Sequence, residues 1–104
     1  MKPVRLAPEA VGELAEAATW YESRDPGLAS RFLEEVERML PTLGARPRSF
    51  PRLVDTAPDL DVRRALLPHF PFALVFLELP ANVRVVAVAH VKRRPGYWLY
   101  RVRP

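Results

Sequence analysis

The sequence predicts an α+β fold in the order β-α-α-β-β-β, with a helical hairpin packed on a small, mainly antiparallel sheet. Apolar side chains recur at helical spacing through residues 8–43. Residues 60–91 contain three strand-like runs joined by short turns. The 104 residues, 49% of them hydrophobic, are enough for a single domain, 1–104, with one core.

The first 23 residues predict a short edge strand followed by a helix. Residues 3–8 read "PVRLAP", in which two aliphatic residues alternate with polar or small ones between prolines, as an edge strand tolerates. The first helix is expected from Pro8 to about Ser23, because proline suits a first helical turn. Its apolar positions follow helical spacing: Val11, Leu14, Ala15, Ala18 and Tyr21.

The second helix is expected to begin at the segment "SRDPG", with Asp25 as N-cap and Pro26 in the first position. Gly44 can end it. Pro41 conflicts with that length, since a proline removes one backbone hydrogen bond and clashes with the preceding turn. The sequence therefore predicts a kink or fraying at Pro41.

The second half predicts an antiparallel meander over residues 60–67, 72–79 and 82–91. The middle run is apolar on both faces, as expected of a central strand. Strict alternation in the last run separates two faces. The set expected against the helices is Val83, Val85, Ala87, Ala89 and Val91, and the opposite set is Arg84, Val86, Val88, His90 and Lys92.

The sheet face away from the helices is expected to be apolar and partly uncovered. Phe72, Leu74 and Phe76, with Val86 and Val88, would lie on it. An exposed apolar patch of this kind usually marks a partner site. Alternatively, the C-terminal segment "GYWLYRVRP" folds back over the sheet and covers part of it.

Composition narrows the function classes. Sixteen Lys and Arg oppose twelve Asp and Glu, and only Lys2 and Lys92 are lysines. The last fifteen residues carry five cations and no acid, which favours a polyanion or an acidic protein as partner. With no Cys and two His, neither a metal site nor another cofactor is expected. No apolar run could span a membrane and no signal peptide is recognisable, so a cytoplasmic protein is expected.

Five segments in order resemble the RelE/ParE superfamily, the toxins of type II toxin-antitoxin systems, also known as plasmid-stabilisation proteins. They are "AVGELAEAATWYE", "PGLASRFLEEVERML", "RPRSFPRL", "VRRALLPHFPFALVF" and "VVAVAHVKRRPGYWLYR". The resemblance covers nearly the whole chain. It implies the same β-α-α-β-β-β fold and a cytoplasmic growth inhibitor that a cognate antitoxin neutralises. Oligomerisation through the antitoxin complex is a further implication.

The resemblance leaves two targets. ParE-like members inhibit DNA gyrase by protein contact, whereas RelE-like members cleave messenger RNA on the ribosome. Metal-free RNA cleavage needs a base, an acid and cations around the phosphate. The catalytic candidates for that chemistry are His90, Arg93, Arg94 and Tyr97. The candidates for contact with the target or with phosphate are Arg63, Arg64, Arg84, Lys92 and Arg101, and those for antitoxin binding are Phe72, Leu74, Phe76 and Trp98.

Several candidates also have structural interpretations. Arg63 and Arg64 are adjacent in a strand and point to opposite faces, so one of them is expected to be structural and to pair with Glu34 or Glu35. Trp20 and Tyr21 are expected in the core. Residues 72–89 supply only Arg84 as a cation, which disfavours the nuclease and favours a ParE-like toxin. A non-toxic, basic nucleic-acid-binding module is a further alternative.

Overall fold

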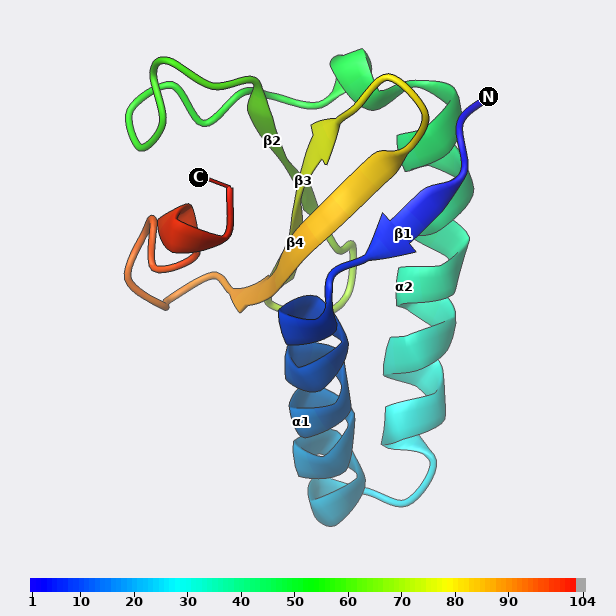
Figure 1. The fold of residues 1–104 in the computed structure, drawn as a ribbon. Coiled ribbons are helices and arrows are strands. Elements are labelled where there is room, and N and C mark those ends of the chain that lie inside the picture. The colour runs from blue at the N-terminus through cyan, green and yellow to red at the C-terminus, as the bar shows by residue number, and fades with distance from the viewer. Residues whose placement is uncertain (103–104) are drawn as a thin grey trace.

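The computed structural model describes residues 1–102, which form a four-stranded sheet with a helical hairpin on one side (Figure 1). Arg103, counted above among the basic residues of the tail, lies outside the described residues. In chain order the elements are β1 (Val4–Leu6), α1 (Pro8–Arg24), α2 (Leu28–Ala45), the 3-10 turn η1 (Pro47–Ser49), β2 (Val62–Leu66), β3 (Phe72–Glu78), β4 (Val83–His90) and the 3-10 turn η2 (Leu99–Arg101). The predicted α+β order is confirmed.

The sheet has the order β1-β4-β3-β2, with β1 parallel to β4 and the other pairs antiparallel. The helical hairpin connects β1 to β2 at the opposite edge of the sheet, and the antiparallel strands β2, β3 and β4 then bring the chain back beside β1. β3 is central, as its apolar character on both faces predicted.

A β-bulge changes the phase of β4. Val75 of β3 opposes Ala87, whereas the next residue, Phe76, opposes Val85, so Val86 is an extra residue without a partner on β3. Beyond the bulge the side chains exchange faces. The alternation predicted for residues 82–91 is therefore right for Val83, Val85 and Val86, and wrong from Ala87 on, where Ala87 lies away from the helices and Val88 faces them.

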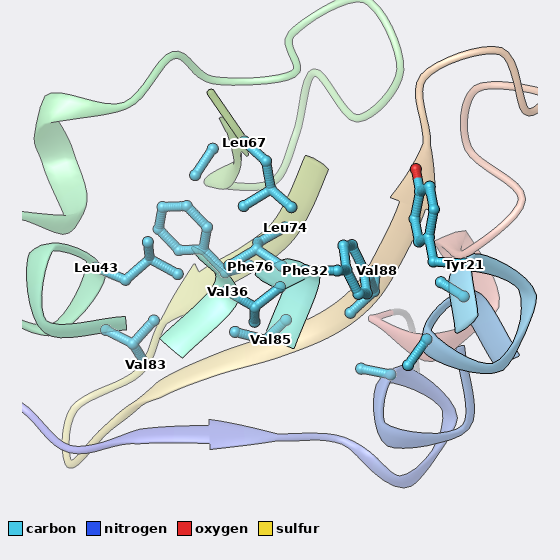
Figure 2. Packing of buried hydrophobic residues seen from close by; sticks show 14 residues of the cluster. Tyr21, Phe32, Val36, Leu43, Leu67, Leu74, Phe76, Val83, Val85 and Val88 are labelled. Atoms are coloured by element: carbon cyan, nitrogen blue, oxygen red, sulfur yellow. The ribbon is translucent and has the colours of Figure 1, made fainter. Parts of the chain in front are cut away.

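The main hydrophobic core, here called the helix-side core, fills the space between the sheet and the two helices (Figure 2). Phe32 of α2 is fully buried in it, and Tyr21 of α1 contacts this ring with a centroid distance of 5.2 Å. Val88 belongs to this core, because the bulge turns it toward the helices. The sheet residues of the core are Ala65, Leu74, Phe76, Val83, Val85 and Val88.

A second cluster, here called the outer cluster, lies on the opposite face of the sheet. Trp98 is 3% exposed and packs there against Val75, Val86 and Ala87. The C-terminal segment thus folds back over the sheet, which was the second of the two expectations for this face.

Helix α1 has the predicted extent, whereas α2 differs in detail from the sequence prediction. Asp25 is not the N-cap of α2, because the helix begins three residues later, after Gly27 in the left-handed conformation (φ 90°). The carboxylate of Glu22 accepts hydrogen bonds from the N–H groups of Gly27 and Ala29, and so caps α2 from the end of α1. Helix α2 continues through Pro41, so the fraying predicted there does not occur, and it ends at Ala45, one residue after Gly44.

Candidate functional site

A groove of about 450 Å³ lies on the sheet face opposite the helices. Its floor consists of small apolar side chains from the two central strands, Ala73, Val75 and Ala89. One wall is the loop of residues 52–56, and the other is the C-terminal segment of residues 91–98. The outer cluster ends where this groove begins, since Val75 and Trp98 belong to both.

Arginine dominates the polar lining of the groove. Four arginines, Arg52, Arg64, Arg93 and Arg94, line it together with one carboxylate, Asp55, and Arg52 also forms an ion pair with Asp61 at 3.4 Å. The guanidinium groups of Arg64 and Arg94 form no hydrogen bond or ion pair with residues 1–102. The groove therefore combines an apolar floor with positive charge available to a ligand.

Arg93 is held against the aromatic wall. Its guanidinium carbon lies 3.7 Å from the centroid of the Tyr97 ring, a stacked cation–π arrangement. One of its nitrogens lies 3.5 Å from a carboxylate oxygen of Glu13 on α1. The stacking orders the side chain, although 54% of it remains exposed.

Glu13 is the centre of a hydrogen-bonded network that the sequence did not reveal. Its carboxylate accepts the Tyr97 hydroxyl at 2.8 Å and two nitrogens of Arg101 at 2.9 and 3.1 Å. It also accepts the backbone N–H of Val88, while Arg101 donates to the carbonyl of Val86. These two side chains thus satisfy backbone groups of β4 beyond the point where β1 ends.

This network fixes the protonation of two candidate residues. Burial, and then the hydrogen bond to Glu13, raise the pKa of Tyr97 to about 12. Burial opposes the charge of Arg101, but the carboxylate of Glu13 outweighs it and raises the pKa of Arg101 further. Arg101 is 8% exposed in its side chain and already paired, so it presents no free charge to a target.

His90 ends β4 without forming an acid–base pair with Tyr97. Its Nδ1 accepts the backbone N–H of Lys92 at 3.1 Å, and its ring packs on Phe72 with a centroid distance of 5.1 Å. Because Val88 faces the helices, strand alternation places the His90 ring on that same side. His90, Arg93, Arg94 and Tyr97 all border the groove, yet the ring of His90 and the hydroxyl of Tyr97 have other partners.

As predicted, only one of the two adjacent arginines of β2 has a structural role, but its partner is not the expected one. Arg63 donates to the backbone carbonyls of Arg48 and Phe50 and forms an ion pair with Asp61 at 3.0 Å. It is the structural member, but the expected pairing with Glu34 or Glu35 is wrong. Arg64 lines the groove. Glu35 is instead bonded to His69, through the backbone N–H at 2.9 Å and Nδ1 at 2.7 Å.

Other candidate residues lie apart from the groove. Arg84 is exposed on β4, before the bulge, and does not line it. Lys92 is exposed in the turn after β4. Trp20 is 53% exposed, with Arg24 stacked on its ring at 4.5 Å, so the expected burial holds for Tyr21 and is wrong for Trp20.

The four residues expected to bind an antitoxin do not form an uncovered surface. Leu74 and Phe76 are fully buried in the helix-side core, and Phe72 packs against it. Trp98 is buried in the outer cluster. The placement of the three β3 residues was wrong because Leu74 and Phe76 face the helices, whereas Val75 faces the groove.

Sequence reasoning also missed one whole wall of the groove. Residues 52–56 belong to a polar, proline-rich connection in which Phe50 and Leu53 are the apolar residues expected to anchor it to the rest of the protein, but the sequence gives no sign that it borders a groove. Leu53 donates its N–H to Val62 and packs on the outer cluster, which ties this loop to the edge of β2.

Comparison with solved structures identifies the fold. The chain superposes with a TM-score of 0.74 on a chain of the structure titled "Chromosomal ParDE TA system from P. aeruginosa". The two are 15% identical, and the match covers 86% of this chain and 96% of that one. No protein-family model and no curated protein matches the sequence. The predicted RelE/ParE-like fold is thereby confirmed.

Two further features of the described residues bear on function. No helix among them has both the length and the apolar character needed to cross a membrane. Within residues 1–102, no three His, Asp or Glu side chains gather in a group that could hold a metal ion.

Proposed function

We propose that this chain is the toxin component of a type II toxin-antitoxin module and that it inhibits its target by protein contact, as ParE-like toxins inhibit DNA gyrase. The fold supports the class, since its structural neighbour is part of a ParDE system. A cognate antitoxin is then the expected partner.

One observation supports inhibition by protein contact rather than RNA cleavage: the two residues best suited to proton transfer, Tyr97 and His90, already have other partners within the protein. The Tyr97 hydroxyl donates a hydrogen bond to Glu13, and its pKa of about 12 is too high for a base near neutral pH. The His90 ring packs on Phe72 and lies on the helix side of β4. What faces the groove is positive charge around an apolar floor, which suits the binding of an acidic protein surface.

A RelE-like ribosome-dependent messenger RNA endoribonuclease is the second candidate. Arg64, Arg93 and Arg94 around one groove supply the kind of cationic site that binds a phosphate. In that case phosphate positioning and charge stabilisation, rather than a histidine–tyrosine pair, would carry the catalysis.

The experiment that separates the two candidates is expression in a bacterial host that lacks the antitoxin. We expect growth arrest with intact messages, together with loss of supercoiling activity when the purified protein is added to gyrase. New translation-dependent cuts inside coding regions, mapped by primer extension within minutes of induction, would instead support the nuclease. Normal growth with soluble, folded protein would contradict both.

A further inference from the structure

Each edge of the sheet is closed in a different way, and one part of one edge is open. At the β1 side, Lys2 donates its backbone N–H to Gly44 of α2 at 3.1 Å, which holds the chain just before β1 against that helix. Beyond the end of β1, two side chains cover the edge of β4: Glu13 accepts the N–H of Val88, and Arg101 donates to the carbonyl of Val86. Side chains thus occupy the positions that a neighbouring strand would take.

The edge of β2 is only half covered. In the loop before β2, the N–H of Leu53 donates to the carbonyl of Val62, and the carbonyl of Pro51 accepts from the N–H of Arg64. Beyond Arg64, the loop no longer pairs with the strand. Because Leu67 donates inward to Phe72, alternation directs the carbonyl of Arg64 and the N–H and carbonyl of Leu66 outward.

These outward groups have no protein partner among residues 1–102, and the side chain of Leu66 is 52% exposed beside them. An edge with unpaired backbone groups is a template for an added strand. Here the open stretch is short, and Pro68 ends it.

The side chains next to this open edge define what kind of strand would bind. Leu66, Ala73 and Ala89 lie in one row across three strands, by the register of the sheet, and the latter two form the floor of the groove. Arg64 lies on the same face of β2, two residues before Leu66. Arg52, Arg93 and Arg94 also border the groove. An incoming strand would meet aliphatic contacts and the guanidinium groups of Arg64 and Arg94, which have no partner among residues 1–102. Arg52 and Arg93 lie beside them, paired with Asp61 and Glu13.

We propose that the open edge of β2 at Arg64–Leu66 accepts an extended, acidic segment of a partner protein as a fifth strand, with alternate side chains directed to the arginine-lined groove. Backbone hydrogen bonds supply the affinity and the arginines select acidic sequence, as in other cases of strand addition. The inference does not depend on toxicity, since it rests on the edge and the charge of the groove alone.

The test is titration of the full chain with a labelled octapeptide that alternates valine with aspartate and glutamate. We expect saturable binding below about 1 mM. We also expect amide chemical-shift changes centred on Leu66 and the groove floor, with slower hydrogen exchange at the Leu66 amide. Added salt is expected to weaken the binding, because exposed charges are screened.

Two N-methylated versions of the peptide distinguish strand addition from simple charge attraction. One carries its methyl groups on the valines and the other on the acidic residues, so both have the same charge. In a strand, alternate N–H groups point to opposite edges, and only one set can face β2. One version is expected to lose binding and the other to retain it.

Two protein variants localise the site. Leu66→Pro removes the outward N–H at a position where an edge strand tolerates proline, and Arg64→Glu reverses the adjacent charge. Each is expected to weaken binding about tenfold, as the loss of one hydrogen bond or ion pair near a charged site predicts. Arg5→Glu is the matched control, because Arg5 is exposed on β1 at the other side of the sheet and the charge change is the same.

Four results would overturn the proposal: no binding at about 1 mM peptide, shift changes confined to the helices, equal affinity of the two methylated peptides, or equal affinity of Arg64→Glu and Arg5→Glu. Arg64→Glu leaves the backbone unchanged, so the test survives if Leu66→Pro does not fold.

Discussion

Glu13 of α1 and Arg101 of η2 form a two-bond ion pair, although 88 positions separate them in the sequence. Both side chains are nearly buried, with 12% and 8% of their surface exposed. The pair joins the first helix to the C-terminal segment across the edge of β4, and it also orders Tyr97 and Arg93 at the groove.

Glu13→Gln is expected to destabilise the protein by about 2–4 kcal/mol, because it leaves the buried guanidinium of Arg101 without its counter-charge. Urea unfolding measures the change. The control is Glu9→Gln, which alters an exposed acid of the same helix and should change the stability little. A Glu13→Gln, Arg101→Met double variant should recover part of the loss, and full additivity of the two single changes would argue against a direct pair.

Tyr97→Phe is expected to cost about 1 kcal/mol near neutral pH, through loss of the hydrogen bond to Glu13. It should leave growth inhibition intact if Tyr97 is structural. The native pKa of about 12 lies above the ordinary value of 10.0 for tyrosine, so the folded state holds the proton more tightly. This contribution to stability is complete below about pH 10 and is lost as the pH rises toward 12.

Unfolding experiments at increasing pH can check that direction. The wild-type protein should lose more stability than Tyr97→Phe between neutral pH and the highest pH that the fold tolerates. When tyrosinate formation is followed by absorbance, the wild-type protein should show a tyrosine that ionises at high pH, and this step should be absent from Tyr97→Phe. A parallel decline of the two proteins would show that Tyr97 does not contribute.

Glu35 is expected to make the fold sensitive to acid. Burial would raise the pKa of this carboxyl, but hydrogen bonds from the backbone and ring of His69 outweigh burial and lower it from 4.5. Stability from this group is present above that value and is lost as the pH falls below it. Glu35→Gln should therefore flatten the decline in stability between pH 6 and pH 3, measured by urea unfolding, whereas Glu34→Gln at the exposed neighbouring position should not.

Gly44→Ala and Gly12→Ala are the same substitution in two helices, and we expect them to change the free energy of unfolding in opposite directions. A methyl group on Gly44 would collide with the backbone carbonyl oxygen of Lys2, so the strand before β1 would have to move away from α2. We expect a loss of about 1–3 kcal/mol. Gly12 has no atom within 4 Å of the added methyl and lies inside α1, so alanine should add about 0.5–1 kcal/mol. Thermal unfolding distinguishes the two.

His90→Gln is expected to leave growth inhibition unchanged, since the His90 ring packs on Phe72 away from the groove floor. A combined Arg64→Ala, Arg94→Ala variant should instead reduce inhibition strongly, because neither guanidinium has a structural role among residues 1–102. Plating efficiency after induction, with circular dichroism to confirm folding, compares the two. Loss of toxicity in His90→Gln alone would favour the nuclease.

The order of elements was predictable from the sequence because hydrophobic periodicity is local, and it placed all four strands and both helices. The faces of the sheet were less predictable. One extra residue, Val86, shifts the phase of β4, and alternation gives no sign of it because every side chain from Val85 to Ala89 is apolar. The cap of α2 also depends on a residue of the preceding helix, Glu22, which local cap rules do not consider.

The groove was partly predictable for a similar reason. Arg93, Arg94 and Tyr97 are close in sequence and form one wall together. Arg52 and Asp55 reach the opposite wall only because the loop before β2 pairs with that strand. The role of Glu13 depends on a contact across most of the chain length, and no local pattern marks it.

The bulge at Val86 divides β4 into two parts whose side chains alternate in opposite phase, although the strand keeps one direction. Val83 and Val85, before the bulge, pack against the helices. After it, Ala87 and Ala89 lie on the outer face of the sheet, and Val88 belongs to the helix-side core. A substitution at Ala89 can therefore reshape the groove floor without a direct effect on the packing of Val83 and Val85, whereas Ala87 is fully buried in the outer cluster. Ala89 lines the groove and lies outside the helix-side core, so it is the position of β4 at which a larger side chain would alter the groove with the least effect on that core.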